Sequence, residues 1–257
     1  MGLFDFFTED IAIDLGTANT LIIHNGKVVV DEPSIVATEL RTGKVIAVGN
    51  KARQMQGKAH KGIETIRPLK DGVIADFDAA EQMIKEFIKS IPSLQNRFWT
   101  PALRMVICIP SGITEVEKRA VHQSAEISGA KEVHLIHEPM AAAIGMSIEV
   151  REPRGNMIID IGGGTTEIAV LSLGGIVKDK SIKVAGDIFT SDIKYFMRKH
   201  HNLVIGERSA EKIKIQVGSA LEDLPANDIE EPDNWDVQGR DQTSGKPKAV
   251  SISYKEI

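Results

Sequence analysis

The sequence predicts an α/β fold that is built twice, with two related domains whose mixed sheets flank a common cleft. One observation is that residues 13–21 (IDLGTANTL) and 159–167 (IDIGGGTTE) match almost position for position. The other is that patterns typical of strands and helices alternate in each half of the chain, as they do in α/β domains. A chain of 257 residues is long enough for two modest cores.

Each of the two matching segments is predicted to be a β-hairpin. Asp14 and Asp160 each close an apolar stretch and open a glycine turn, and a second apolar stretch follows each turn. Glycine lets backbone N–H groups approach a phosphate closely, and an aspartate can hold Mg²⁺ through the waters that the ion retains. Ordinary hairpin turns also favour Gly, Asn and Asp, but this explanation is weak for two matching copies. The pair predicts a nucleotide triphosphate and its metal between the halves.

Other classes of site and of protein are excluded. A P-loop needs a lysine after its second glycine, and neither turn has one. The Rossmann glycines open a helix, whereas Gly164 leads into a strand pattern. A net charge of −5 with mixed signs argues against nucleic acid as a partner. The single cysteine, Cys108, and the lack of a signal-peptide pattern or a long apolar run predict a cytoplasmic protein.

The first half continues with short strands and then alternates between strands and helices. Residues 28–30, 34–38 and 45–48 are predicted to form a small antiparallel region, followed by a short helix and a loop over 49–64. Residues 79–91 carry the apolar stripe of an amphipathic helix. A strand at 105–109 precedes a helix that a capping box at Thr114 and Glu117 begins and Gly129 ends. A strand at 132–136 and a helix from Pro139 complete this half.

The second half begins after the polar residues 151–155, which include Pro153 and predict a domain boundary. A strand at 176–184 and helices at 188–200 and 209–217 follow the second hairpin, and residues 222–247 are expected to be a surface loop or insertion. These patterns predict a first core domain at 1–32 and 66–147 with a small inserted subdomain at 33–65. They predict a second core domain at 148–185 and 250–257 with an inserted subdomain at 186–249.

Five segments of the chain resemble the MreB family of rod-shape-determining bacterial actins. They are residues 14–20 (DLGTANT), 67–76 (RPLKDGVIAD), 110–113 (PSGI), 138–145 (EPMAAAIG) and 160–167 (DIGGGTTE). The resemblance runs from about residue 9 to the end, and the segment 67–76 is not shared with the wider superfamily of actins, chaperones and sugar kinases. It implies an actin-like (ribonuclease H-like) fold. It also implies ATP-dependent assembly into filaments on the inner face of the membrane, which work with the cell-wall elongation machinery and determine rod cell shape.

The resemblance also implies roles for individual residues. A first phosphate loop would comprise Gly16, Thr17, Ala18 and Asn19, and a second would comprise Gly162, Gly163, Gly164 and Thr165. Asp14 and Asp160 would hold the Mg²⁺ shell through water. Glu138, together with Thr165, would orient or activate the water that attacks the γ-phosphate. Glu211, Lys212 and Lys214 fall where the family contacts ribose and adenine, and a solvated helix face is the alternative explanation.

Apolar side chains at two exposed-looking places suggest contact with a membrane. Phe98 and Trp99 lie between polar residues, and tryptophan favours the bilayer interface, so a membrane-inserting loop is predicted. A loop that folds back onto the core is the alternative. Residues 3–7 (LFDFF) are a second candidate wedge, and many copies along a filament would add avidity.

The resemblance leaves the end of the chain and the choice of function to be tested. Chains of the family continue past the equivalent of Ile257 with a third glycine-rich loop under the adenosine, so we expect this sequence to be C-terminally incomplete. The same fold also serves sugar or acetate kinases, which need an acceptor pocket and a base such as Glu138, and chaperone ATPases, which need a separate peptide-binding domain. We expect a slow ATPase coupled to polymerisation rather than a metabolic enzyme.

Overall fold

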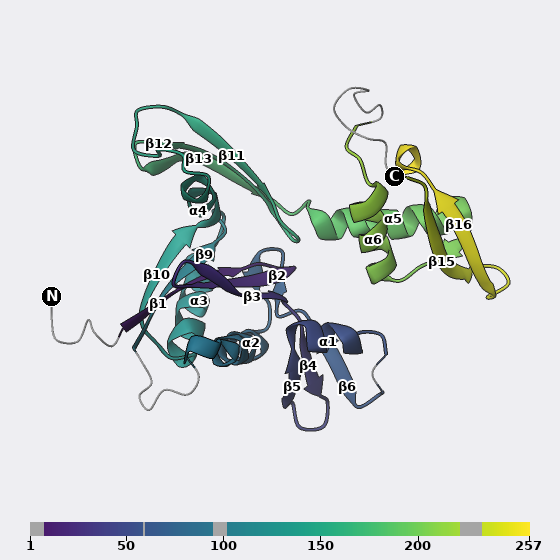
Figure 1. Cartoon of the computed structure of the whole chain (residues 1–257), viewed down its shortest axis with the longest axis horizontal. Coiled ribbons are helices and arrows are strands. Elements are labelled where there is room, and N and C mark those ends of the chain that lie inside the picture. Colours follow the sequence, from purple (N-terminus) through teal and green to yellow (C-terminus); the bar gives the residue numbers. More distant parts are fainter. Residues whose placement is uncertain (1–7, 59, 95–101, 222–232) are drawn as a thin grey trace. The chain divides into compact units, whose positions relative to one another are not determined.

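The computed structural model of the protein describes residues 8–58, 60–94, 102–221 and 233–257. The chain forms two compact units, Met1–Ala185 and Gly186–Ile257. Figure 1 shows the elements of both units, coloured along the sequence. None of the described helices combines the length and the apolar character that crossing a bilayer requires.

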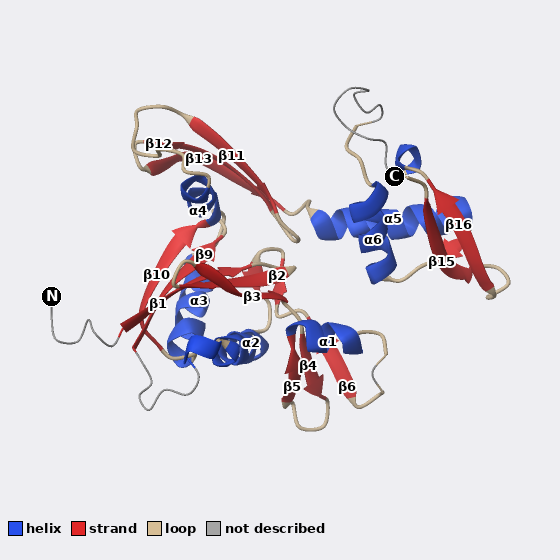
Figure 2. Ribbon diagram, in the orientation of Figure 1, coloured by secondary structure: helices blue, strands red, loops and turns tan. Residues whose placement is uncertain are grey.

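The first unit is built on a five-stranded mixed sheet with the order β10-β9-β1-β2-β3. Strand β1 runs parallel to β9 and antiparallel to β2, and β10 runs parallel to β9. Two helices, α2 and α3, cover one face of this sheet (Figure 2). The bounds are β1 Thr8–Leu15, β2 Asn19–His24, β3 Lys27–Pro33, β9 Ala102–Ile109, β10 Ala130–His137, α2 Phe77–Ser90 and α3 Glu115–Ile127.

Alternating apolar residues explain how this sheet and its helices pack. Ile11, Ile13 and Leu15 of β1 are buried on one face, as the period of two along a strand requires. The apolar stripe of α2 is buried against them. Helix α3 begins at the predicted capping box, in which Thr114 and Glu117 each bond the other's backbone, so the sequence signal for this helix start is confirmed.

A small subdomain with its own core follows β3. Helix α1 packs on a three-stranded antiparallel sheet with the order β5-β4-β6, and the residues buried between them are Ile35, Ala37, Ala47 and Ala52. The bounds are β4 Val36–Glu39, β5 Val45–Val48, α1 Gly49–Met55 and β6 Ile63–Ile66. The chain then makes a short hairpin from β7 (Leu69–Lys70) and β8 (Val73–Ile74).

The rest of the first unit is an antiparallel sheet with the order β11-β12-β13, packed on α4. Its core consists of Ala143 of the helix and Ile158, Ala169 and Leu171 of the strands. Pro139 lies in the first turn of α4, where its missing N–H costs nothing. The bounds are α4 Glu138–Gly145, β11 Asn156–Ile161, β12 Thr166–Ser172 and β13 Gly175–Ile182.

The second unit packs two helices, α5 and α6, around a core with a small antiparallel sheet of the order β14-β15-β16. The bounds are α5 Gly186–His201, β14 Leu203–Val204, α6 Glu207–Val217, β15 Trp235–Asp241, β16 Pro247–Ile252 and a 3₁₀ turn at Tyr254–Glu256. Ile252 and Tyr254 are buried in this core. Residues 250–257 therefore pack with the second unit, which differs from their predicted place in the second core domain.

The expected surface loop at 222–247 is wrong where the structure describes it, because residues 235–241 form strand β15. Only Val237 of this strand is buried, so the sequence lacks the apolar alternation that usually indicates a strand. Pairing with β14 and β16 supplies the order instead. Gly239 is required there, because a Cβ atom would lie 2.7 Å from the Val204 carbonyl oxygen.

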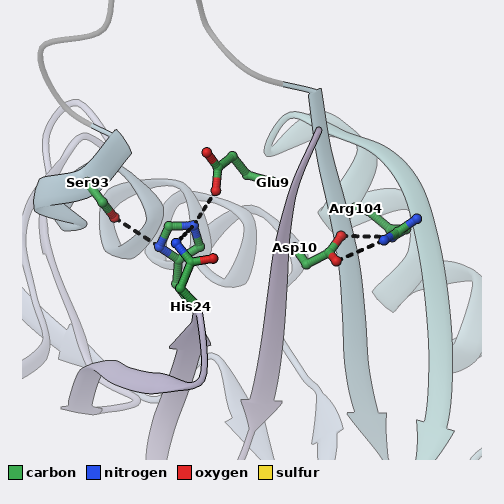
Figure 3. Close-up of polar contacts among 6 residues, drawn as sticks. Glu9, Asp10, His24, Ser93 and Arg104 are labelled. Atoms are coloured by element: carbon green, nitrogen blue, oxygen red, sulfur yellow. Dashed lines mark hydrogen bonds and ion pairs between the residues drawn. The ribbon is translucent and has the colours of Figure 1, made fainter. Parts of the chain in front are cut away.

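A polar network around the buried His24 lies at the start of β1 (Figure 3). His24 is 3 % exposed, and its Nε2 lies 2.8 Å from Glu9 Oε2 while its Nδ1 lies 2.9 Å from Ser93 Oγ. Beside it, the Arg104 guanidinium donates two hydrogen bonds of 2.8 Å to Asp10. The glycine turn lies at the other end of β1, so this network holds the sheet at the end remote from that turn.

Candidate functional site

The two predicted hairpins are confirmed, and they share one register. Asp14 pairs with Leu21 across the first hairpin, and Asp160 pairs with Glu167 across the second. The turns between the last paired residues span 16–19 and 162–165. Gly16 is needed, since a Cβ atom there would lie 2.7 Å from the Asn19 carbonyl oxygen, and a Cβ atom at Gly162 would make a tight contact of 3.3 Å with the Thr165 carbonyl oxygen.

The two turns are packed directly against one another within the first unit. A Cβ atom at Gly163 would lie 2.7 Å from Ala18 Cβ, and one at Gly164 would lie 2.7 Å from Thr17 Oγ1. Thr17 and Thr165 are both buried in this contact. The structure therefore brings together the two sets of residues that the sequence assigned to phosphate binding.

A serine from the chain after β3 braces the first turn. Ser34 Oγ donates a 2.6 Å hydrogen bond to the Gly16 carbonyl oxygen and lies 2.9 Å from Thr20 Oγ1. Its backbone N–H donates to the Ala18 carbonyl oxygen. Thr20 and Ser34 are both fully buried, so these hydrogen bonds hold the turn from its protein-facing side. In the second hairpin, Thr166 Oγ1 donates to the Val184 carbonyl oxygen, which uses that hydroxyl for structure.

A third segment, the turn between β7 and β8, fills the junction of the two hairpins. Asp71 and Gly72 adopt left-handed conformations, with φ of 52° and 79°. The Gly72 N–H donates a 3.0 Å hydrogen bond to Thr17 Oγ1, and a Cβ atom here would lie 3.0 Å from Thr165 Cγ2. The Lys183 ammonium lies 3.5 Å from the Asp71 carboxylate. Residues 67–76 carry the family resemblance, and their Asp-Gly pair is also a turn signal in the sequence.

Four carboxyl groups, those of Asp14, Glu138, Asp160 and Glu167, lie beside these turns, and their charges help to raise the pKa values of Asp14, Glu138 and Asp160. Burial, together with the charges of Asp14, Glu167 and Asp160, raises the pKa of Glu138 from 4.5 to about 8. Burial and then Asp160 raise the pKa of Asp14, and burial and then Glu167 raise that of Asp160. Asp14 is itself exposed to solvent. The burial that raises its pKa therefore comes from protein atoms packed around a carboxylate that water still reaches.

The same group of charges affects the pKa of the Cys108 thiol. Burial, then Asp14, Glu138 and Asp160, raise its pKa to about 12. It lies on β9, in the apolar run that the sequence predicted as a strand. Cys108 is therefore a protonated thiol beside the carboxylates.

Glu167 is the last residue of the second motif, and the sequence predicted no role for it. It is 1 % exposed, and its Oε2 accepts a 3.1 Å hydrogen bond from the Ser111 N–H. Its Oε1 is buried without a hydrogen-bond partner among the described residues. The available signal was a charged residue, Glu167, at the start of a stretch that is otherwise apolar and was expected to be a strand.

The remaining predicted site residues do not belong to the paired turns. In the second unit, Glu211 and Lys214 join α6 to α5: the Lys214 ammonium lies 2.7 Å from Glu211 Oε2 and donates 3.1 Å hydrogen bonds to Thr190 Oγ1 and to the Gly186 carbonyl oxygen. Lys212 is exposed on α6. Phe98 and Trp99, predicted to meet the membrane, lie outside the described residues.

The group of carboxylates does not form a site of direct metal ligands. Within the described ranges, no three His, Cys, Asp or Glu side chains are close enough together to hold a metal ion. A cation that keeps its own waters, as Mg²⁺ does, is the kind of ion that such an open arrangement suits.

Comparisons with known proteins identify the family of the chain. The family model described as MreB/Mbl protein matches residues 8–257. The chain is 48 % identical over 252 residues to the cell shape-determining protein Mbl of Bacillus subtilis, covering 98 % of this chain and 73 % of that protein. It is 46 % identical over 256 residues to the cell shape-determining protein MreB of Escherichia coli, covering 98 % and 72 %.

A solved structure supports the same conclusion for the fold. The crystal structure of MreB5 of Spiroplasma citri bound to AMPPNP is 39 % identical, with a TM-score of 0.87, and the match covers 97 % of this chain and 72 % of that one. The actin-like fold and the family resemblance that the sequence indicated are thus confirmed. The chain belongs to the MreB/Mbl family of actin-like, cell shape-determining proteins.

Proposed function

We propose that this chain binds ATP with Mg²⁺ at the paired hairpins and hydrolyses it slowly as part of a polymerisation cycle. The observation that carries the proposal is the direct contact of the two glycine turns beside carboxylates whose pKa values are raised. Converging negative charge is costly unless a cation balances it. The relative from Spiroplasma citri was solved bound to AMPPNP and also bound to ADP.

The residues present fit this ligand and its metal. Gly16 and Gly162–Gly164 carry no Cβ atom, and glycine is the residue type that favours close approach of backbone N–H groups to a phosphate. Asp14 and Asp160 would hold Mg²⁺ through its waters. When bound, that ion neutralises phosphate charge and so favours phosphoryl transfer.

Glu138 is suited to move or orient the attacking water. Burial and the neighbouring carboxylates raise the pKa of Glu138 to about 8, so it holds a proton near neutrality in the free protein. A bound Mg²⁺ would offset the charges of Asp14, Glu167 and Asp160 and leave Glu138 as a carboxylate that can orient the water or accept its proton. It begins helix α4 directly after β10, so its backbone is fixed by the sheet. Thr165, buried at the junction of the turns, would share this role.

The remaining expectations belong to the same proposal. Family membership favours assembly of the chain into homopolymer filaments on the inner face of the cytoplasmic membrane, where they would organise the cell-wall elongation machinery. Phe98 and Trp99 would insert into the bilayer interface. The adenosine contacts assigned to Glu211, Lys212 and Lys214 are part of the proposal too.

Hydrolysis and binding can be separated by one substitution. Glu138→Ala should lower phosphate release by roughly 100-fold, the lower range for loss of a general base, while a fluorescent ATP analogue still binds. Glu64→Ala, on an exposed strand position of the small subdomain, is the matched control. Undiminished phosphate release by Glu138→Ala would refute the assigned role, and no nucleotide binding by the unsubstituted chain would refute the proposed function.

Polymerisation and membrane binding need a separate experiment. ATP-dependent pelleting should occur with the unsubstituted chain, and co-sedimentation with anionic liposomes should be lost when Phe98 and Trp99 are changed to Ser. Pelleting that is independent of nucleotide would count against the polymerisation cycle. Retained liposome binding by the double variant would count against the loop.

A further inference from the structure

We propose that Glu167 is a positioning residue for the metal. Its carboxylate would accept a hydrogen bond from a water that Mg²⁺ retains, without contacting the ion directly. This inference rests on the proposed Mg²⁺–nucleotide site. It begins from a buried carboxylate with one oxygen bonded to the Ser111 N–H and the other without a partner among the described residues. A buried charged oxygen left in this state is costly.

The register of the hairpins shows that the fold does not need this charge. Glu167 lies directly opposite Asp160, whereas the equivalent position of the first hairpin, opposite Asp14, is Leu21. Like charges directly opposite one another destabilise a strand pair. The first hairpin keeps the same strand pairing with an apolar residue, Leu21, at the equivalent position. Strand pairing therefore does not explain why a glutamate occupies position 167.

A hydrated cation resolves both costs at once. Its waters are donors, so they can supply the missing hydrogen bond to Glu167 Oε1, and its charge offsets the repulsion between Glu167 and Asp160. The other oxygen holds Ser111 in the chain after β9, which fixes the direction of the carboxylate. Outer-shell acceptors of this kind orient the waters and ligands around a metal.

Glu167→Gln tests the charge while keeping an oxygen that can accept from the Ser111 N–H. In nucleotide-free protein without Mg²⁺, the urea midpoint should rise, because a buried repulsion is removed. With a fluorescent ADP analogue, the Mg²⁺ concentration needed for half-maximal binding should rise roughly 10–100-fold, as is usual for loss of an outer-shell partner. Glu64→Gln, the same chemical change on an exposed strand, should alter neither quantity.

A second variant and the negative outcomes keep the two proposals apart. Glu167→Met also removes the bond to Ser111, and it too should raise the Mg²⁺ concentration needed for half-maximal binding, as Glu167→Gln does. If Glu167→Gln lowers the urea midpoint or fails to fold, the residue is structural and the inference is overturned. An unchanged Mg²⁺ requirement overturns it as well, with the proposed function intact. If the unsubstituted chain binds no Mg²⁺–ADP, both proposals fall.

Discussion

Glu138→Gln should remove a pH dependence of folding stability that the unsubstituted chain shows near neutrality. In the unfolded chain this carboxyl ionises near 4.5, whereas in the folded chain burial and the charges of Asp14, Glu167 and Asp160 raise its pKa to about 8. Between these values the folded state holds a proton that the unfolded state has released. Stability therefore falls as pH rises through this window, because the unfolded state binds fewer protons.

The size of the effect follows from the shift. Each unit corresponds to about 1.4 kcal/mol, and integration between pH 6 and pH 8 gives a loss of about 2 kcal/mol. Partial exposure of the Glu138 side chain allows solvent to screen part of this, so about 1 kcal/mol is the lower end of the expected loss. Glutamine has the same shape and does not titrate. The free energy of unfolding of Glu138→Gln, relative to that of the unsubstituted chain, should therefore be higher at pH 8 than at pH 6 by this amount.

Urea unfolding followed by circular dichroism at pH 6, 7 and 8, without Mg²⁺ or nucleotide, measures this difference. Asp14 and Asp160 titrate in both proteins, so the quantity of interest is the gap between the two stability curves rather than either curve alone. Glu64→Gln controls for loss of one exposed charge. Parallel curves for Glu138→Gln and the unsubstituted chain across this range would refute the reasoning.

Three further outcomes follow from the described contacts. Gly164→Ala should weaken binding of a fluorescent ATP analogue about tenfold, because the new methyl group would lie 2.7 Å from Thr17 Oγ1, while Gly145→Ala, with nothing within 4 Å, should bind normally; equal binding by both would count against the packed turns. His24→Ala should lower the free energy of unfolding by about 3 kcal/mol, because it removes a buried side chain together with its hydrogen bonds to Glu9 and Ser93, whereas Asp10→Ala, at a pair whose aspartate side chain is 64 % exposed, should cost under about 1 kcal/mol; equal losses in urea unfolding would contradict the assignment. Cys108, whose pKa is raised to about 12, should react with a thiol reagent at pH 8 far more slowly than free cysteine, and rapid labelling of the folded chain would show that the thiol is not held in this environment.

Local signals in the sequence were enough for most elements. Glycine turns between apolar stretches located both hairpins, and the capping box at Thr114 located the start of α3. Strand β15 could not be predicted, because its order comes from its neighbours and only Val237 is buried. Propensity and periodicity carry no information about such pairing.

The site was predictable in its parts but not in its assembly. The sequence identified Asp14, Asp160 and both glycine turns, because duplication makes them visible. It could not show that Gly72 bonds Thr17, or that Glu167 bonds Ser111, since those pairs are 55 and 56 residues apart. Nor could it show that Lys214 is engaged with α5, because a solvated helix face and a network between helices have the same spacing.

The junction of the two turns with Asp71 and Gly72 has a consequence for the order of folding. Each hairpin closes through neighbouring residues and can form early, but Ala18 meets Gly163 only after most of the first unit has been synthesised and folded. Contacts between distant residues pay loop-closure entropy before they gain any bonding energy. During refolding, strand circular dichroism should therefore recover before nucleotide affinity, which makes ligand binding a reporter of the completed native state.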